Sequence, residues 1–245
     1  MIIKRFNLEG IPITTYQTDE ETKKPILFFF HGFRSHRDLG IMGRGEILAS
    51  KGFHVIAMDA YMHGERQLPF FTEASDSRKQ QEMINIINHT AKDAQYLYHK
   101  YFKQYNTNPD KIYAFGVSMG AATAFFLASI MPELKTMVSI VGSPSFYDFY
   151  QNKQEVHGFE QDEYYYSNLA YYKEICPLLN YERMANKQIF MANGTTDQII
   201  PLKYAKELAE KLNDPEVIFK TYETGHLSTP EMLEEAYQFL EDHKE

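Results

Sequence analysis

One serine of this chain lies in a pattern that can make it a nucleophile. Residues 116–120 read Gly-Val-Ser-Met-Gly, which fits the G-x-S-x-G sequence of a tight strand-to-helix turn. Such a turn lifts the serine hydroxyl above a sheet, and the glycines on either side avoid side-chain collisions. A strand-like run (KIYAFGV) precedes Ser118, and a helix-like run (AATAFFLASIM) follows it. The context therefore predicts that Ser118 is a nucleophile.

A serine hydroxyl is a weak nucleophile at neutral pH, so it needs a base. Three histidines follow Ser118 in the chain: His157, His226 and His243. His226 comes after Gly225, between the last predicted strand and the final helix, where a loop can bring an imidazole over the serine. We predict that His226 is the base.

The base needs a carboxylate that fixes its tautomer and stabilises the imidazolium. Asp197 lies in the sequence GTTDQIIP, directly after a predicted strand, and the chain order serine, acid, histidine is the one expected to follow this type of strand-to-helix turn. Glu223, three residues before His226, and Asp148 are alternatives. We predict Asp197 as the acid.

Acyl transfer also needs amide donors for the oxyanion. The residue after the nucleophile, Met119, is expected to give one N–H. The apolar run FFF leads directly into His31-Gly32-Phe33, so we assign the second donor to the N–H of Phe33.

Other polar residues near the predicted strand ends have a structural interpretation. His31 is expected to be a hydrogen-bonded structural histidine. Asp59 and His63 follow another strand but complete no metal-ligand spacing, so we expect them to order a loop. Three arginines could bind an anionic substrate, but solvated surface charge is the simpler expectation for them: Arg34, Arg37 and Arg66.

Strand-like and helix-like segments alternate along the chain. We predict strands over residues 2–6, 11–16, 26–30, 53–58, 112–117, 137–141, 189–192 and 216–222, the first two forming a hairpin at one sheet edge. Helices are predicted over residues 83–101, 121–131, 204–212 and 230–243. This alternation predicts an α/β fold with a largely parallel sheet and helices on both faces.

The alternation is interrupted between Gly142 and Asn186, a segment rich in tyrosine. Its aromatic content argues against disorder. We therefore expect a single domain over residues 1–245, with a lid or cap insertion over residues 143–186 above the strand ends.

The composition of the chain indicates which binding partners and which cellular compartment to expect. The 245 residues carry a net charge of −8 without a clustered basic patch, which argues against nucleic acid. The longest nearly apolar stretch, residues 117–131, is too short and too interrupted to span a membrane. The lone Cys176 cannot form an internal disulfide. The first residues, MIIKRFNLEG, have no apolar run after their charges that could serve as a secretion signal. We expect a cytoplasmic protein; the sequence leaves its oligomeric state open.

Taken in order, HGF, DAYMHGER, GVSMG, GTTDQIIP and GHLSTPEML resemble the α/β-hydrolase superfamily, and more narrowly small bacterial carboxylesterases with a prolyl-oligopeptidase-like domain. The resemblance covers the chain from about Pro25 onward. It implies an eight-stranded, mostly parallel sheet and ester hydrolysis through an acyl-enzyme, without metal or cofactor. It also implies the triad Ser118, Asp197 and His226.

Three functions fit these observations. The first is an esterase or deacetylase acting on small-molecule acyl esters. The second is an aminopeptidase, amidase or thioesterase with the same machinery, in which lid carboxylates could bind a substrate amine: Glu155, Glu160, Asp162 and Glu163. The third is a hydrolase fold used for ligand binding or protein contact, since one fold can host unrelated functions.

Overall fold

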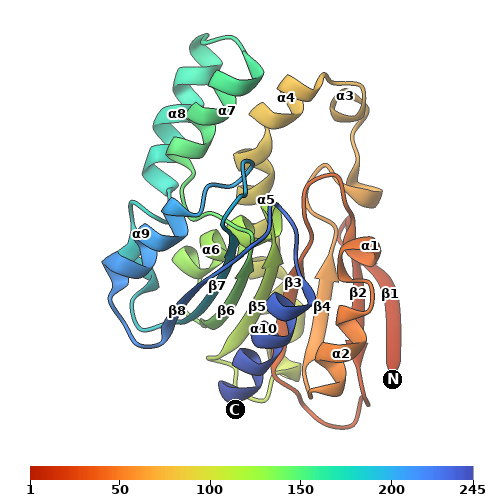
Figure 1. Ribbon diagram of the computed structural model, residues 1–245. Coiled ribbons are helices and arrows are strands. Elements are labelled where there is room, and N and C mark those ends of the chain that lie inside the picture. The colour runs from red at the N-terminus through yellow and green to blue at the C-terminus, as the bar shows by residue number, and fades with distance from the viewer. Residues whose placement is uncertain (245) are drawn as a thin grey trace.

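The computed structural model describes residues 1–244, which form an eight-stranded sheet (Figure 1). The spatial order is β1-β2-β4-β3-β5-β6-β7-β8. The strands are β1 (Ile2–Leu8), β2 (Ile11–Gln17), β3 (Ile26–Phe30), β4 (His54–Met58), β5 (Ile112–Val117), β6 (Leu134–Ile140), β7 (Gln188–Gly194) and β8 (Val217–Tyr222). Strands β1 and β2 are antiparallel, as are β2 and β4, and all other neighbours are parallel. The predicted fold class and edge hairpin are confirmed.

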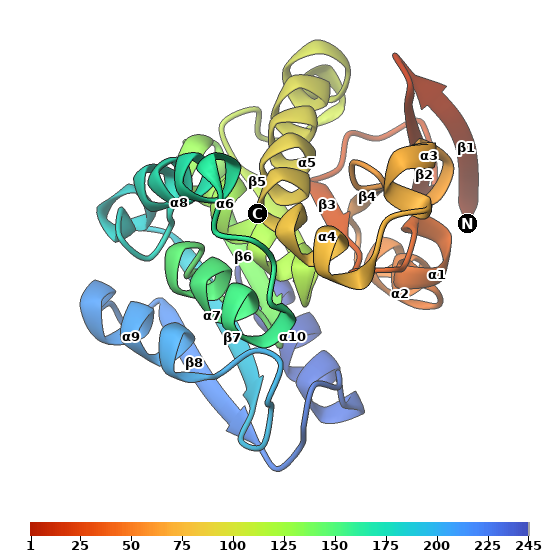
Figure 2. The same cartoon turned by 90° about the horizontal axis from the view of Figure 1, so that it is seen from above.

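Helices cover both faces of this sheet (Figures 1 and 2). They are α1 (Arg37–Ile41), α2 (Arg44–Ser50), α3 (Pro69–Thr72), α4 (Asp76–Gln81), α5 (Met83–Leu97), α6 (Met119–Ile130), α7 (Tyr147–His157), α8 (Glu163–Ile175), α9 (Lys203–Leu212) and α10 (Pro230–Asp242). The buried apolar side chains form two clusters, one containing α5 and α6 and the other α2 and α10. The central strands lie between these clusters, which explains why β3 and β4 are buried along their whole length.

The predicted helix over residues 83–101 changes its geometry before its end. Regular α-helix stops at Leu97, and a wider π-helical turn continues over Tyr98–Phe102. The short helices α1 to α4 were not predicted, because four to seven residues are too few to show a helical apolar period.

The segment 143–186 contains α7 and α8, which lie above the carboxyl ends of the strands (Figure 1). Its tyrosines supply its packing. Tyr150 stacks on Tyr165 with ring centroids 5.3 Å apart and meets Tyr172 edge-on at 4.9 Å. Helix α8 contacts the rest of the chain where the Tyr164 hydroxyl donates to Glu82 Oε1 at 2.9 Å. The aromatic residues therefore hold two helices together above the sheet.

Glycines make the turn between β5 and α6 possible. A Cβ atom on Gly116 would lie 2.2 Å from the carbonyl oxygen of Gly120, and one on Gly120 would lie 2.1 Å from the carbonyl oxygen of Phe30. Both distances are far below van der Waals contact, and the obstacle in each case is backbone. These two positions cannot carry a side chain unless the strand and the helix move apart.

We predict that Gly120→Ala lowers the free energy of unfolding by about 3 kcal/mol or more, because the added methyl group collides with main chain. Gly158 is the matched control. It ends α7 at φ 62° with nothing within 4 Å of an added Cβ, so Gly158→Ala should cost only about 1 kcal/mol of left-handed strain. Urea unfolding of both variants measures the difference; equal losses would contradict the assigned crowding.

Candidate active site

Ser118 lies between β5 and α6 in a strained backbone conformation, with φ 56° and ψ −116°. Its N–H donates to the carbonyl oxygen of Ile140 at 2.9 Å, and its own carbonyl oxygen accepts from Ala121 N–H at 2.9 Å. Such strain persists only where the surrounding structure holds the residue in place. The two hydrogen bonds and the flanking glycines hold the Ser118 backbone in this conformation.

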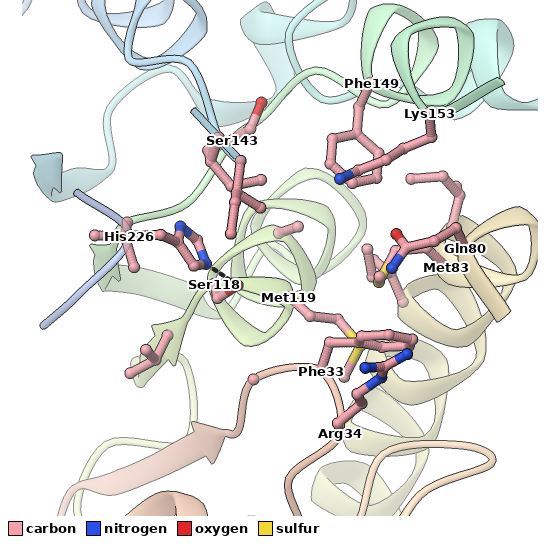
Figure 3. A pocket seen from close by; sticks show the side chains of 18 of the residues that line it. Phe33, Arg34, Gln80, Met83, Ser118, Met119, Ser143, Phe149, Lys153 and His226 are labelled. Atoms are coloured by element: carbon pink, nitrogen blue, oxygen red, sulfur yellow. Dashed lines mark hydrogen bonds between the residues drawn. The ribbon is translucent and has the colours of Figure 1, made fainter. Parts of the chain in front are cut away.

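The structure brings together the three residues predicted as a triad. Ser118 Oγ lies 2.8 Å from His226 Nε2 (Figure 3), and His226 Nδ1 lies 2.7 Å from Asp197 Oδ2. Asp197 comes from the turn after β7, and His226 comes from the loop after β8. Parallel neighbouring strands end at the same edge of a sheet, which is why these distant residues meet there.

Asp197 is held on both of its carboxylate oxygens. Oδ1 accepts the N–H groups of Ile199 and Ile200, each at 2.9 Å, while Oδ2 faces His226. Its side chain is fully buried. The two alternative acids lie elsewhere: Glu223 is exposed, and Asp148 accepts from Ser145 Oγ at 2.6 Å.

This arrangement suits proton transfer from the serine. A carboxylate can only accept, so the proton of the neutral imidazole is assigned to Nδ1, facing Asp197. The lone pair of Nε2 then faces the Ser118 hydroxyl, at a distance suitable for general-base catalysis.

Phe33 and Met119, whose amides were predicted as oxyanion donors, line the same pocket as Ser118. Within residues 1–244, no acceptor takes the N–H of Phe33 or Met119. Met119 begins α6, where unpaired N–H groups and the helix dipole favour negative charge. A Cβ built on Gly32 would lie 3.7 Å from Ser118 Cβ, so the loop before Phe33 touches the turn that carries Ser118.

His31 supports this loop, as predicted. Its Nε2 accepts the N–H of Ala60 at 3.0 Å, and its Nδ1 lies 2.8 Å from the carbonyl oxygen of Gly32. Burial lowers the pKa of His31 to about 4. The ring is therefore neutral near pH 7 and links the loop before Phe33 to the loop after β4.

Asp59 orders the loop after β4, as expected. The fully buried carboxylate accepts Arg37 Nη1 at 2.5 Å and the N–H of Glu65 at 2.9 Å. Arg37 was expected to be a solvated surface charge, and that is wrong: its side chain is 7% exposed. Arg66 is also mostly buried and pairs with Asp93 at 2.7 Å. Only Arg34, which pairs with Asp76, is well exposed.

A pocket of about 520 Å³ opens above Ser118 and His226 (Figure 3). Its apolar wall includes Met83, Ile84, Ile87, Phe146 and Phe149. Its polar lining includes Arg34, Asp76, Gln80, Ser143, Lys153 and His157. These side chains come largely from α4, α5 and the segment 143–186.

Sequence reasoning missed most of this pocket lining. Met83, Ile84 and Ile87 follow the three-and-four spacing of one helical face, and that spacing was a usable signal for α5. It does not tell whether the face meets the core or a cavity, because both are apolar.

The described residues contain neither a metal-ligand cluster nor a helix able to span a membrane. Within residues 1–244, no cluster of three or more His, Cys, Asp or Glu side chains could hold a metal ion. Over the same residues, no helix combines the length and apolar character needed to cross a membrane.

Comparison with known proteins places the chain among hydrolases. Residues 21–149 match the family described as serine aminopeptidase, S33. The esterase YjfP of Escherichia coli is 24% identical over 240 residues, which is 91% of each chain.

Solved structures share the fold. The protein TT1662 of Thermus thermophilus superimposes with a TM-score of 0.78 at 20% identity, covering 99% of this chain and 98% of the other. Alpha/beta hydrolase domain-containing protein 10 from mouse gives 0.68 at 14% identity, covering 99% and 98%. The chain therefore has the α/β-hydrolase fold.

His31 should make stability depend on pH. Its pKa is lowered from 6.5 to about 4 in the folded protein, so the unfolded chain takes up a proton first as the pH falls. The contribution of neutral His31 to the free energy of unfolding is therefore complete above pH 6.5 and is lost as the pH falls from 6.5 to 4. At pH 5 the loss is about 2 kcal/mol. We predict that His31→Gln loses correspondingly less stability than wild type between pH 7 and pH 5.

Denaturant unfolding at the two pH values measures this difference. The exposed His36 gives a matched control, because His36→Gln removes a histidine without removing a buried one. If His31→Gln and wild type lost equal stability, a neutral structural role for His31 would be excluded.

Proposed function

The chain belongs to the serine aminopeptidase, S33, family of α/β-hydrolases, and from this premise we propose that it is a serine hydrolase that cleaves small acyl esters. The observation that carries the proposal is the continuous hydrogen-bonded row from Ser118 through His226 to Asp197 at the base of a pocket. That row contains a nucleophile, a base and an orienting carboxylate at bonding distances.

In the proposed reaction, Ser118 Oγ adds to the ester carbonyl carbon while His226 Nε2 takes the hydroxyl proton. The N–H groups of Phe33 and Met119 donate to the oxyanion of the tetrahedral intermediate. The intermediate collapses, the alkoxide leaves with the proton from His226, and an acyl-enzyme remains. Water then adds to this acyl group by the same route, which releases the acid and restores Ser118.

The charges around the pocket favour an ester over a peptide with a free amino terminus. Such a substrate would need carboxylates to bind its ammonium group. The lid carboxylates considered for this role are all exposed and outside the pocket lining: Glu155, Glu160, Asp162 and Glu163. Asp76 does line the pocket but is paired with Arg34. Lys153 adds a positive charge that would repel the amine.

A panel of nitrophenyl esters beside aminoacyl nitroanilides tests this choice. We expect the esters to be turned over faster, in line with the name of the relative YjfP. Faster turnover of the anilides would favour the aminopeptidase or amidase alternative. Thioester analogues of the best ester would test the thioesterase alternative in the same assay.

We predict that Ser118→Ala lowers kcat by roughly 10⁴- to 10⁶-fold, because the remaining groups cannot supply a nucleophile. Circular dichroism should show an unchanged fold. A fluorophosphonate probe should label wild type and leave the variant unlabelled. The exposed Ser167 of α8 gives a control, and Ser167→Ala should keep both activity and labelling. An unlabelled wild type would favour the non-catalytic alternative.

We predict that Asp197→Asn lowers kcat by roughly 10³- to 10⁴-fold, because an amide can hold His226 in the wrong tautomer. Glu223→Gln is the matched control, since Glu223 is the neighbouring exposed carboxylate. It should keep kcat within about twofold of wild type, as a surface change away from the site. Steady-state kinetics of both variants decides between the two acids; a larger loss in Glu223→Gln would reverse the assignment.

A further inference from the structure

Lys153 is a buried cation that the proposed chemistry does not use. It lies on α7, is 9% exposed and lines the pocket. Its Nζ lies 5.0 Å from the centroid of the Phe149 ring, and Figure 3 shows it reaching over that ring into the cavity. Within residues 1–244, neither a carboxylate nor a hydrogen-bond acceptor pairs with it.

The other charged groups around the pocket leave Lys153 without a counter-ion. Arg34 and Asp76 pair with each other. The negative charge of Asp197 acts on Lys153 from a distance, but its carboxylate is taken up by His226 and two amides. Burial lowers the pKa of Lys153 despite that charge. The side chain is largely removed from water while its ammonium group lines the pocket, so an anion bound in the pocket would compensate the charge.

Gln80 is a second unpartnered polar group in the same pocket. Its Oε1 is buried and has no hydrogen-bond partner among the described residues. It lies on α4, which packs against α7, and Figure 3 shows its amide on the same side of the cavity as Lys153. Since the oxygen and nitrogen of a glutamine amide can exchange places by rotation, Gln80 can also present an N–H donor.

The position of these groups relative to Ser118 indicates which part of a substrate they meet. The leaving alcohol must lie next to His226, which returns the proton, and the oxyanion must face Phe33 and Met119. The acyl chain then extends away from His226, toward the apolar wall with Met83 and Phe149. Lys153 and Gln80 border that wall, so they meet the far end of the acyl chain.

Building on the proposed function, we propose that Lys153 and Gln80 bind a carboxylate at the far end of the acyl chain. The preferred substrates are then monoesters of dicarboxylic acids, with methylene groups along the apolar wall and the free carboxylate at Lys153. A carboxylate supplies the acceptor that the Lys153 ammonium lacks, and it can also accept from Gln80 when the amide is turned so that its N–H faces the cavity.

Turnover of two esters matched in chain length tests the proposal. The 4-nitrophenyl monoester of adipic acid carries a terminal carboxylate, whereas 4-nitrophenyl hexanoate ends in a methyl group. Lys153→Met keeps the apolar stem and removes the charge. We expect the ratio of kcat/KM for the adipate ester to that for the hexanoate ester to fall at least tenfold in Lys153→Met. An unchanged ratio overturns the site.

Lys173→Met is the control variant. Lys173 lies on α8 with its Nζ 5.5 Å from the Tyr147 ring centroid, a similar aromatic contact, but it is exposed and outside the pocket lining. In Lys173→Met the ratio of kcat/KM for the adipate ester to that for the hexanoate ester should stay within about twofold of wild type. A fall equal to that of Lys153→Met would mean a general charge effect and would overturn the proposal.

Two further esters decide which side of the substrate carries the charge. In 4-carboxyphenyl hexanoate the carboxylate is on the alcohol, and phenyl hexanoate is its neutral partner. If Lys153→Met lowers the selectivity for this pair and leaves the adipate pair unchanged, the assignment to the acyl side is wrong.

Binding to a protein without its nucleophile separates this inference from the proposed function. Calorimetry on Ser118→Ala should show monomethyl adipate binding at least tenfold tighter than methyl hexanoate, and Lys153→Met should abolish the difference. If wild type hydrolyses no ester but this binding difference holds, the proposed function fails and the anion site stands. If esters are hydrolysed through Ser118 but neither selectivity nor affinity depends on Lys153, the site fails alone.

Discussion

The close approach of two stretches of backbone at Gly120 is the constraint on which the rest of the site depends. Because Gly120 has no side chain, the first turn of α6 packs directly against the carbonyl oxygens of Phe30 and His31. The same contact brings the loop after β3 beside the turn that carries Ser118. Both proposed oxyanion donors, the amides of Phe33 and Met119, belong to these two touching segments. Their separation is thus set by main chain, which moves less than side chains do.

A second backbone contact fixes Asp197 and His226, the proposed acid and base, relative to each other. A Cβ on Gly194 would lie 2.4 Å from the carbonyl oxygens of both Thr224 and Gly225, and Thr196 N–H donates to Thr224 at 3.1 Å. The turn that carries Asp197 and the loop that carries His226 are therefore joined by main chain. The hydrogen bond between these two side chains follows from how β7 and β8 end, and it needs no support from the pocket wall.

The difference between features set by local backbone patterns and features set by packing of distant segments explains what could be predicted from the sequence. The strands of the core, the nucleophile's turn and the order of Ser118, Asp197 and His226 depend on local patterns and a shared sheet edge, so short stretches of sequence reveal them. Arg37 was misjudged because its burial depends on Asp59, which lies 22 residues away. Lys153 and Gln80 could not be assigned to one cavity either, because polar residues on an amphipathic helix usually face solvent. Only the packing of α4 against α7 brings their helices together.

The family resemblance bears on the strand ends, whereas the substrate depends on the pocket lining. The proposed triad lies on strand ends of the shared fold, whereas most of the polar pocket lining comes from α4 and from the segment between β6 and β7. A relative 24% identical in sequence is therefore a guide to the chemistry rather than to the substrate. The net charge of −8 would repel an anionic substrate at long range, but salt screens such repulsion beyond about 8 Å. Inside the pocket, the nearby unpaired ammonium of Lys153 outweighs the distant acidic surface, since attraction strengthens as distance and dielectric constant fall.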